Sequence, residues 1–309
     1  MNYLSELIDK LIVQVKSAGI DIVDIFISDN HSVDGTGDYL KGVSSQYDFI
    51  KYVTQKKNIG IDRNMLFVMS MAKSKYIFPL GDDELIEDNV LSTLISQYLT
   101  KDLDLLVMNG RHVEANHKVR HHLPIHLNDA IFSNPIEAFE ALWDKMPMSS
   151  FIVNAKSLEE IDDVKYLGTS HAYTGIVWDY LIQKYKSFGY VNIQCTSEPI
   201  IIFRKIPKTW RANAAKIMFH EIPLWFKKLP KEYPKKTVLE YMKSQSNILN
   251  LLTYRASGQL DQSFINSYMT DFSKQEKKKA VLIANMPLGL SKIIMIFINI
   301  LRKVKRILW

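Results

Sequence analysis

The feature that most constrains the fold is the alternation, over residues 3–110, of short apolar runs with segments of helical periodicity. Residues 3–18, 61–74 and 87–99 place their apolar side chains at the spacing of an amphipathic helix. Strands that alternate with helices favour an α/β fold with a mainly parallel sheet. Four of the apolar runs have the length of a buried strand: IVDIFIS (22–28), FIKYV (49–53), KYIFPL (75–80) and DLLVMNG (104–110).

The pattern changes in the second half of the chain. Residues 134–146 open with Asn-Pro, which is typical of a helix start, and two late strands are predicted within residues 191–204. Beyond about residue 211 the sequence has helical periodicity, Lys-rich spacers and no strand candidate. We therefore expect a sheet domain over residues 1–212 and a helical region over residues 213–309.

Composition narrows the class of protein. Hydrophobic residues make up 47% of the chain, which is enough for a core and excludes wholesale disorder. The single cysteine, Cys195, allows no internal disulfide and fits a reducing compartment. Glu6 and Asp9 stand where a signal peptide would be basic and then apolar, and no run reaches the roughly 18 apolar residues of a membrane span. We expect a cytoplasmic protein.

Three carboxylates follow the third strand run in the stretch YIFPLGDDE (76–84). Ligands of open parallel sheets bind beyond the carboxyl ends of the strands, where Asp82, Asp83 and Glu84 are expected. Crowded carboxylates resist ionisation unless a cation neutralises them, and hard oxygen ligands suit Mg²⁺ or Mn²⁺ shared with a substrate phosphate. The alternative is a solvated turn whose acidic residues begin the next helix.

A second polar strand end lies in ISDNHSVDGT (27–36), where Asp29 and Asn30 follow the first strand run. The segment NIGIDRN (58–64) comes next. These segments and YIFPLGDDE, in this order and at this spacing, resemble the motifs of family 2 glycosyltransferases of the inverting GT-A type. They look closest to the bacterial branch that includes abequosyltransferases, in which an LGDDD-like motif replaces the commoner Asp-x-Asp-Asp. The resemblance covers roughly residues 3–215.

The resemblance implies a fold and a reaction. The fold is the Rossmann-like GT-A fold of nucleotide-diphospho-sugar transferases, with a mainly parallel sheet and here a C-terminal helical extension. The reaction moves a sugar, with inversion, from a nucleotide-diphosphate donor to an oligosaccharide acceptor that is typically lipid-linked. Such enzymes build bacterial surface polysaccharides such as the O-antigen of lipopolysaccharide or a capsule.

The resemblance also implies roles for individual residues. Asp29 falls where the family has an aspartate that contacts the nucleotide base, and Asn30 lies beside it. Asp83 falls on the metal-binding aspartate of the Asp-x-Asp signature, with Asp82 next to it. Gly81 occupies the place of the first aspartate of the commoner form, so the metal-binding set departs from the usual pattern.

Other positions are less closely matched. Glu84 replaces the usual last aspartate, and its longer side chain could still orient the loop. Arg63 could reach a phosphate or only cover a helix face. The segment RKIPKTWRAN (204–213) supplies cations that could screen a diphosphate or simply be solvated: Arg204, Lys205, Lys208 and Arg211.

The catalytic base is predicted from YLGTSHAYTGIVWDYL (166–181), which resembles the Gly-x-x-His segment of the branch. His171 is the candidate that takes the proton of the acceptor hydroxyl, because an imidazole pKa near 6.5 suits general-base catalysis at neutral pH. The alternative is a structural or acceptor-binding histidine. Asp179 is the reserve candidate, or else a surface residue of an amphipathic helix.

The N-terminal segment departs from the family. Relatives usually begin with a strand and a nucleotide-holding turn, whereas this sequence begins MNYLSELIDKL. That strand would lie mid-sheet, and its absence would leave backbone groups of two neighbours unpaired. An upstream start, a damaged copy and another segment that fills the gap all stay open. The second hypothesis is therefore a catalytically impaired relative that acts as a binding or scaffolding subunit.

Gly-Asp-Asp also marks RNA polymerases, in which it lies in a hairpin turn. Here the motif is predicted between a strand and a helix, and no aromatic-basic interleaving accompanies it, so we expect no nucleic-acid partner.

The final segment, GLSKIIMIFINILRKVKRILW (289–309), contains five cations and no acidic residue. Helical spacing places one polar stripe on it: Lys292, Asn299, Arg302, Lys303 and Arg306. Such a helix is typical of the surface of an anionic membrane, although it could also pack on the body of the protein. We expect peripheral attachment to the inner face of the cell membrane, to which KKLPKEYPKK (227–236) could add basic charge.

Overall fold

The computed structural model describes residues 2–19, 22–114, 119–120, 129–159, 163–205 and 209–307. The chain forms two compact units. The first comprises Met1–Leu167 and His171–Pro207, and the second comprises Gly168–Ser170 and Lys208–Trp309. The division falls a few residues ahead of the boundary that we place at residue 212.

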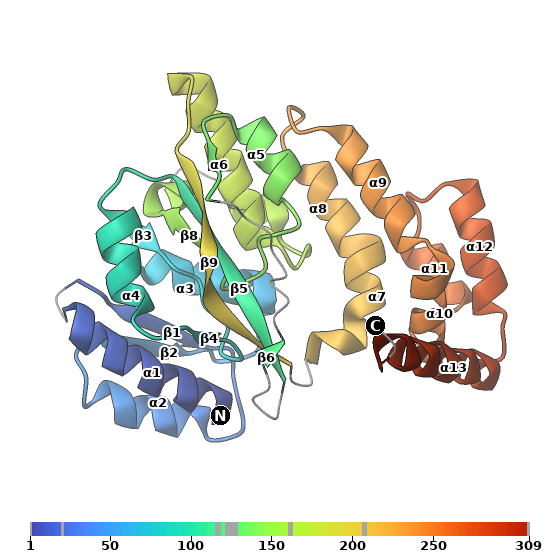
Figure 1. Ribbon diagram of the computed structural model, residues 1–309, viewed down its shortest axis with the longest axis horizontal. Coiled ribbons are helices and arrows are strands. Elements are labelled where there is room, and N and C mark those ends of the chain that lie inside the picture. Colours follow the sequence, from blue (N-terminus) through green and yellow to red (C-terminus); the bar gives the residue numbers. More distant parts are fainter. Residues whose placement is uncertain are drawn as a thin grey trace. The chain divides into compact units, whose positions relative to one another are not determined.

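The first unit contains a small parallel sheet of β1 (Ile25–Asp29) and β2 (Ile50–Thr54). Helices α1 (Asn2–Ala18) and α2 (Thr36–Ser44) lie beside this sheet (Figure 1). Ile8 of α1 and Leu40 of α2 are buried in one cluster with Ile50 of β2. Helix α3 (Ile61–Met71) contacts β1.

The larger sheet of the first unit has the strand order β3-β8-β5-β9-β4. Strands β5 and β9 pair in parallel from Leu105 opposite Ile193 to Glu114 opposite Lys205, while β3, β4 and β8 pair antiparallel. The two longest pairings, β1–β2 and β5–β9, are therefore parallel, and the predicted α/β class is confirmed. The strands are β3 (Tyr76–Ile77), β4 (Leu85–Ile86), β5 (Leu105–Glu114), β6 (Val119–Arg120) beside β5, β7 (Ile131–Phe132) beside β9, β8 (Phe151–Asn154) and β9 (Ile193–Lys205).

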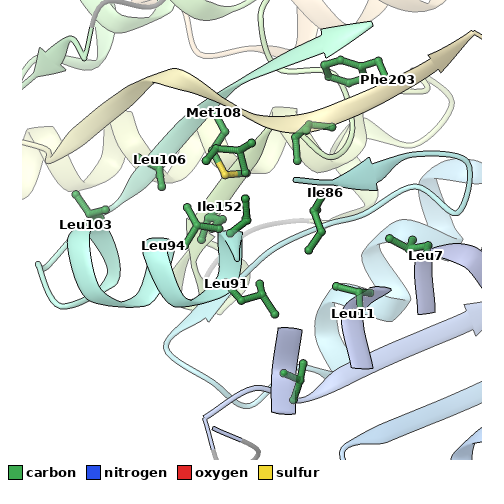
Figure 2. Close-up of a cluster of buried hydrophobic side chains, with 14 residues drawn as sticks. Leu7, Leu11, Ile86, Leu91, Leu94, Leu103, Leu106, Met108, Ile152 and Phe203 are labelled. Carbon is green, nitrogen blue, oxygen red and sulfur yellow. The ribbon is translucent and has the colours of Figure 1, made fainter. Parts of the chain in front are cut away.

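A hydrophobic cluster joins α1 to this larger sheet (Figure 2). Leu7 and Leu11 of α1 lie in one cluster with Leu106 of β5 and Ile152 of β8, and all four are buried. The other helical segments of the first unit are α4 (Val90–Thr93), the π-helical turn η1 (Leu94–Leu99), α5 (Pro135–Leu142), the 3₁₀ turns η2 (Ala155–Leu158) and η3 (Asp163–Tyr166), and α6 (Ala172–Phe188).

One local signal acts as the sequence predicts, and a second is visible only in the structure. The Asn134 side chain accepts a hydrogen bond from Ile136 N at 2.8 Å, and Pro135 begins α5. Helix α6 ends at Gly189, whose φ of 78° is the left-handed conformation that glycine adopts most readily at a helix end.

The second unit is helical throughout its described part from residue 209. Phe219 lies at its centre, with ring centroids 5.5 Å from Tyr254 and 5.3 Å from Phe272. No single helix in the described ranges is long and apolar enough to cross a membrane; α12 and α13 pass that test only as a pair bent by 101°. The helical segments are η4 (Thr209–Asn213), α7 (Ala214–Lys216), η5 (Ile217–Glu221), α8 (Ile222–Lys228), α9 (Lys235–Gln245), α10 (Ile248–Ala256), α11 (Gln262–Tyr268), α12 (Lys274–Ala284) and α13 (Leu288–Ile307).

Candidate functional site

The acidic loop, Gly81–Glu84, follows β3 as a tight turn in which Glu84 N donates to Gly81 O at 3.3 Å. Gly81 N donates to Ser149 Oγ at 2.8 Å, and Ser149 is fully buried with a φ of 79°. A Cβ at position 81 would lie only 3.1 Å from Asp83 Oδ1 and 3.6 Å from Ser149 Oγ. A side chain at position 81 would therefore require the Asp83 carboxylate to shift by a few tenths of an ångström.

Arg204 binds the backbone of the acidic loop. Its Nε donates to Asp83 O at 2.8 Å, and its Nη2 lies 3.3 Å from Asp82 O. Its Nη1 donates to Glu6 Oε2 of α1 at 2.5 Å. The side chain is only 10% exposed and is engaged by the loop and by Glu6, so the screening of a diphosphate by Arg204 stays a prediction. It binds the loop carbonyls and fixes the loop's shape.

Glu84 has a structural part in the same arrangement. Its side chain is buried, and its Oε2 accepts a hydrogen bond from Arg204 N at 3.0 Å. The carboxylate therefore links the loop to β9. Of the other cations suggested for the diphosphate, Lys205 and Lys208 have side chains outside the described residues, and Arg211 is exposed in η4 of the second unit.

Asp82 and Asp83 are the carboxylates that remain at the surface of the loop. Asp82 is exposed and Asp83 half-buried. Reduced access to water raises the pKa of the Asp82 carboxyl, and the charge of Asp83 raises it further. Two like charges held side by side disfavour each other's ionisation, and a bound cation would relieve this.

A divalent ion fits this pair of residues. Within the described ranges no three His, Cys, Asp or Glu side chains gather in a metal-binding group. Mg²⁺ is typically held by one or two carboxylates and completes its coordination with waters and substrate phosphates. Asp82 and Asp83 could supply these two carboxylates, so further protein ligands are not required.

Asp29 is the last residue of β1 and is 5% exposed. Its Oδ1 accepts a hydrogen bond from Ser32 N at 2.9 Å, whereas its buried Oδ2 has no hydrogen-bond partner in the described part of the chain. An unsatisfied buried carboxylate oxygen is costly, so this atom suits a ligand that brings a donor. Asn30 joins two loops: it donates to Asn58 Oδ1 at 3.1 Å and accepts from Ile59 N at 2.9 Å.

The two predicted strand ends meet at one cavity of about 720 Å³. Asp29, Asn30 and Asp82 line it together with Gly81 and Met148. Its volume lies in the range of small-molecule sites, about 300–1,000 Å³. Both predicted strand ends therefore contribute polar residues to one cavity, whose other lining residues are mostly apolar.

His171 stands at the N-cap position of α6 and is half-buried. Its ring lies 6.2 Å from the ring of Tyr173 at an interplanar angle of 19°. Tyr173 is buried, and its hydroxyl is hydrogen-bonded to the backbone of Met148, which lines the cavity beside Gly81. Burial raises the pKa of Tyr173, and the charge of Asp62 adds to this. One buried ring thus connects His171 to the lining of the cavity.

Residues 2–157 match the family model described as "Glycosyl transferase family 2". This chain belongs to that family. Over 189 residues it is 29% identical to "Abequosyltransferase RfbV" of Salmonella typhimurium, a match that covers 57% of this chain and 56% of the relative. Over 107 residues it is 24% identical to "Glycosyltransferase GlyG" of Streptococcus pneumoniae serotype 4, covering 35% of this chain and 34% of that protein.

The matched segments thus span about a third to little more than half of these relatives' own lengths. Among solved structures, residues 1–349 of S. aureus TarS in complex with UDP-GlcNAc superpose with a TM-score of 0.59 at 12% identity, covering 91% of this chain and 76% of that chain. The same TarS fragment in another crystal structure gives a TM-score of 0.54 at 11% identity, covering 90% and 73%. The predicted GT-A fold and the resemblance to the abequosyltransferase branch are confirmed.

In this family 2 glycosyltransferase, four predicted site residues are not among those that line the cavity: Arg63, Asp83, His171 and Asp179. Arg63 is exposed in the first turn of α3 and is not among the residues that line the cavity, so its contact with a phosphate stays a prediction. Asp179 is buried, not on a surface, and both its oxygens accept hydrogen bonds from Lys165 Nζ, at 2.8 and 3.0 Å. It lies eight residues along α6 from His171, about 12 Å at 1.5 Å per residue, and this placement favours a structural role.

Asp62 is a site residue that the sequence does not single out. It is buried in the first turn of α3, and its Oδ1 accepts a hydrogen bond from Ala172 N at 3.1 Å. It therefore caps the helix that begins beside His171 and favours that helix end electrostatically. The acidic residue within NIGIDRN is visible in the sequence, but its partner lies 110 residues away.

Proposed function

We propose that this chain transfers a sugar from a nucleoside-diphosphate donor to a hydroxyl of an oligosaccharide acceptor, with inversion at the anomeric carbon. The observation that carries the proposal is that Asp29, with its unpartnered buried oxygen, and Asp82 of the acidic loop line one cavity. The relative from Salmonella, whose name gives it as an abequosyltransferase, supports a place in O-antigen synthesis. The TarS structure holding UDP-GlcNAc supports a nucleotide-sugar donor.

Each end of the donor has a partner of suitable chemistry. Asp29 Oδ2 accepts a hydrogen bond from an N–H of the base, which satisfies an oxygen that has no partner among the described residues. Asp82 and Asp83 hold Mg²⁺ or Mn²⁺, and such an ion supplies the positive charge that neutralises a departing diphosphate. Arg204 binds the backbone carbonyls of both residues and so fixes the shape of the loop that carries them. Arg63 is a further candidate for a phosphate contact.

His171 acts as the base in this proposal. Its imidazole takes the proton of the acceptor hydroxyl as that oxygen attacks the anomeric carbon. The bond from that carbon to the diphosphate oxygen breaks on the opposite face, so the configuration inverts. Stacking on Tyr173 orients the ring.

A lipid-linked acceptor would place the protein at the inner surface of the cell membrane. Helix α13 supports this because its apolar side chains are not all used in packing: Ile293, Phe297 and Leu301 are 51%, 62% and 66% exposed. The exposed Lys292 and Arg302 lie on the same helix. The side chains of Lys303 and Arg306 lie outside the described residues.

A catalytically impaired relative that binds or scaffolds is the second candidate. The observation that favours it is the largely apolar lining of the cavity between β1 and β3. A turnover assay separates the two functions. The protein is incubated with Mn²⁺ and a panel of UDP-, GDP-, CDP- and dTDP-sugars, and release of the nucleoside diphosphate is measured with and without lipid-linked oligosaccharide.

We expect acceptor-stimulated release from one donor class, lost in Asp83→Asn and retained in Asp88→Asn. Asp88 is a matched control because it is exposed, pairs with Lys10 at 2.9 Å and does not line the cavity. Tight donor binding with no release from any donor would favour the binding role. Equal release by wild type and Asp83→Asn would refute the assignment of the acidic loop.

A further inference from the structure

The residue that precedes His171 belongs to the second compact unit. Gly168–Ser170 forms part of that unit together with residues 208–309, whereas the chain on either side of these three residues belongs to the first unit. His171 therefore follows directly on a segment that packs within the helical unit. A side chain of the helical unit that holds this segment also holds the backbone that leads into the candidate base.

The segment before His171 has an unusual backbone. Gly168 has a φ of 82° and Ser170 a φ of 57°, both in the left-handed region. Glycine adopts this region readily, but serine rarely does, and such a residue persists where surrounding contacts hold it. Thr169, which lies between them, is fully buried. The path of the chain into His171 is therefore set by tertiary contacts and not by local preference.

Glu221, the last residue of η5, supplies such a contact. Its Oε2 accepts a hydrogen bond from Ser170 Oγ at 2.6 Å, the length of a strong hydroxyl-to-carboxylate bond. Its Oε1 pairs with Lys216 Nζ at 2.9 Å. The Glu221 side chain is only 10% exposed, so the carboxylate is fixed between its two partners and in turn fixes the Ser170 hydroxyl.

The other side of His171 is held by α6. His171 O accepts a hydrogen bond from Gly175 N at 3.0 Å, and the next amide, Ala172 N, donates to Asp62 Oδ1 at 3.1 Å. The backbone of His171 is thus held from both directions, by Glu221 through the preceding residue and by the first turn of α6. The position of the imidazole depends on both, because the side chain is built on that backbone.

We propose that Glu221 is a positioning residue: through the Ser170 hydroxyl it holds the backbone that carries His171 into α6. The inference rests on the proposed function, in which His171 is the base. Loss of the carboxylate frees Ser170 from its left-handed conformation and lets the imidazole move away from the acceptor hydroxyl. A misplacement of about 1 Å can cost about 10²-fold in rate.

The test is a double-mutant cycle in the full chain. Glu221→Ala removes the acceptor of the hydrogen bond, and Ser170→Ala removes its donor. We expect each variant to lower the turnover rate per folded molecule by about 10–100-fold with the affinity for the donor unchanged. Because both act through one bond, the double variant should lose no more than either single variant.

Two further variants complete the cycle. Glu221→Gln keeps a side-chain oxygen that can accept from Ser170 and should retain most of the turnover. Glu240→Ala is the matched control and should leave turnover unchanged, because that glutamate belongs to the same unit and its side chain is 66% exposed.

Amide hydrogen exchange supplies a readout that needs no turnover. We expect the amides of Ala172 and Gly175 to exchange at least about ten-fold faster in Glu221→Ala and in Ser170→Ala than in the wild type. Faster exchange in an enzyme whose turnover survives His171→Gln would refute the base role in the proposed function and leave the hold of Glu221 on this segment supported.

Three results would overturn the proposal. The first is unchanged exchange at both amides, whether or not the protein turns over. The second is unchanged turnover in Glu221→Ala and Ser170→Ala of an enzyme that His171→Gln inactivates, which would reduce Glu221 to a structural carboxylate. The third is a double variant whose loss of turnover is the sum of the two single losses, which would exclude the route through Ser170.

Discussion

Arg204 Nε lies 2.8 Å from the carbonyl oxygen of Asp83, so a residue of β9 fixes the backbone of the loop that carries the candidate metal ligands. Glu84 completes the link from the loop side, because its carboxylate accepts from Arg204 N at 3.0 Å. The guanidinium contacts the backbone carbonyls of Asp82 and Asp83 and not their carboxylates. Arg204 therefore fixes the backbone of the acidic loop, whereas the proposed metal binding uses the side chains.

Replacing Arg204 tests this arrangement. Arg204→Lys cannot reproduce a fork of donors that reaches Asp83, Asp82 and Glu6 together. We expect the affinity for Mn²⁺ and donor nucleotide to fall about ten-fold, which corresponds to about 1.4 kcal/mol, with the fold retained by circular dichroism. Calorimetric titration measures the affinity, and Arg211→Lys is the exposed control. An unchanged affinity would mean that the loop keeps its shape without this side chain.

Ser149 tests the other support of the loop. Ser149→Ala removes the acceptor of the Gly81 N–H, and because the site is buried we expect a loss of about 1–3 kcal/mol of unfolding free energy. Ser149→Gly loses the same bond but relieves the left-handed backbone at φ 79°, which offsets about 1 kcal/mol. Denaturant titration of the two variants measures both effects. If the alanine variant proved the more stable, the strain argument would be contradicted.

The charge of Asp82 gives a pH prediction. Its pKa is raised in the folded state, so the folded protein retains the proton to higher pH than the unfolded chain. The stability that the protonated Asp82 carboxyl contributes is thus fully present below the pKa of the unfolded state, about 3.9. It is lost as the pH rises through the pKa of the folded state. We expect Asp82→Asn to raise Tm at pH 7 and to have no effect on Tm below that unfolded pKa.

Mn²⁺ should raise Tm of the wild type at pH 7 and have a much smaller effect on Asp82→Asn. Scanning calorimetry at pH 3.5, 5 and 7 provides the data. A gain in Tm for Asp82→Asn that is the same at all three pH values would show that the charge of Asp82 is not its cause.

Variants of His171 and Asp179 should differ in what they lose: turnover rate for His171 and stability for Asp179. His171→Gln should lower the turnover rate about 10²–10⁴-fold, the usual contribution of a general base, with donor affinity unchanged. Asp179→Asn removes one partner of a buried ion pair and should lower stability, while the folded fraction keeps its turnover rate. His220→Gln, in the second unit, is the control. The reverse pattern would make Asp179 the base.

The extent to which the sequence predicts the fold depends on how local each signal is. β1, β2 and β5 are found because each is a continuous apolar run, although Pro79 restricts the regular part of KYIFPL to Tyr76–Ile77. The four-residue FIVN strand, β8, is not predicted, because a run this short cannot be told from a buried loop. Its place between β3 and β5 is a tertiary property.

The candidate site likewise contains residues that the sequence predicts and residues that it does not. Asp29, Asp82 and Asp83 are predicted because they follow strands, and the carboxyl ends of parallel strands meet at one edge. Ser149 and Arg204 are not predicted as loop supports, because their partners lie 68 and 121 residues away in the sequence. Such contacts follow from the folded arrangement and have no local pattern.

Calorimetric titration of the full chain with UDP, GDP, CDP and dTDP, each with Mn²⁺ and with EDTA, tests the central claim most directly. We predict that one diphosphate binds the wild type in Mn²⁺, and that EDTA or Asp83→Asn weakens this binding at least about ten-fold while Asp88→Asn does not. Binding of the same strength in EDTA and in Asp83→Asn would contradict the claim that these carboxylates hold the donor through a divalent ion.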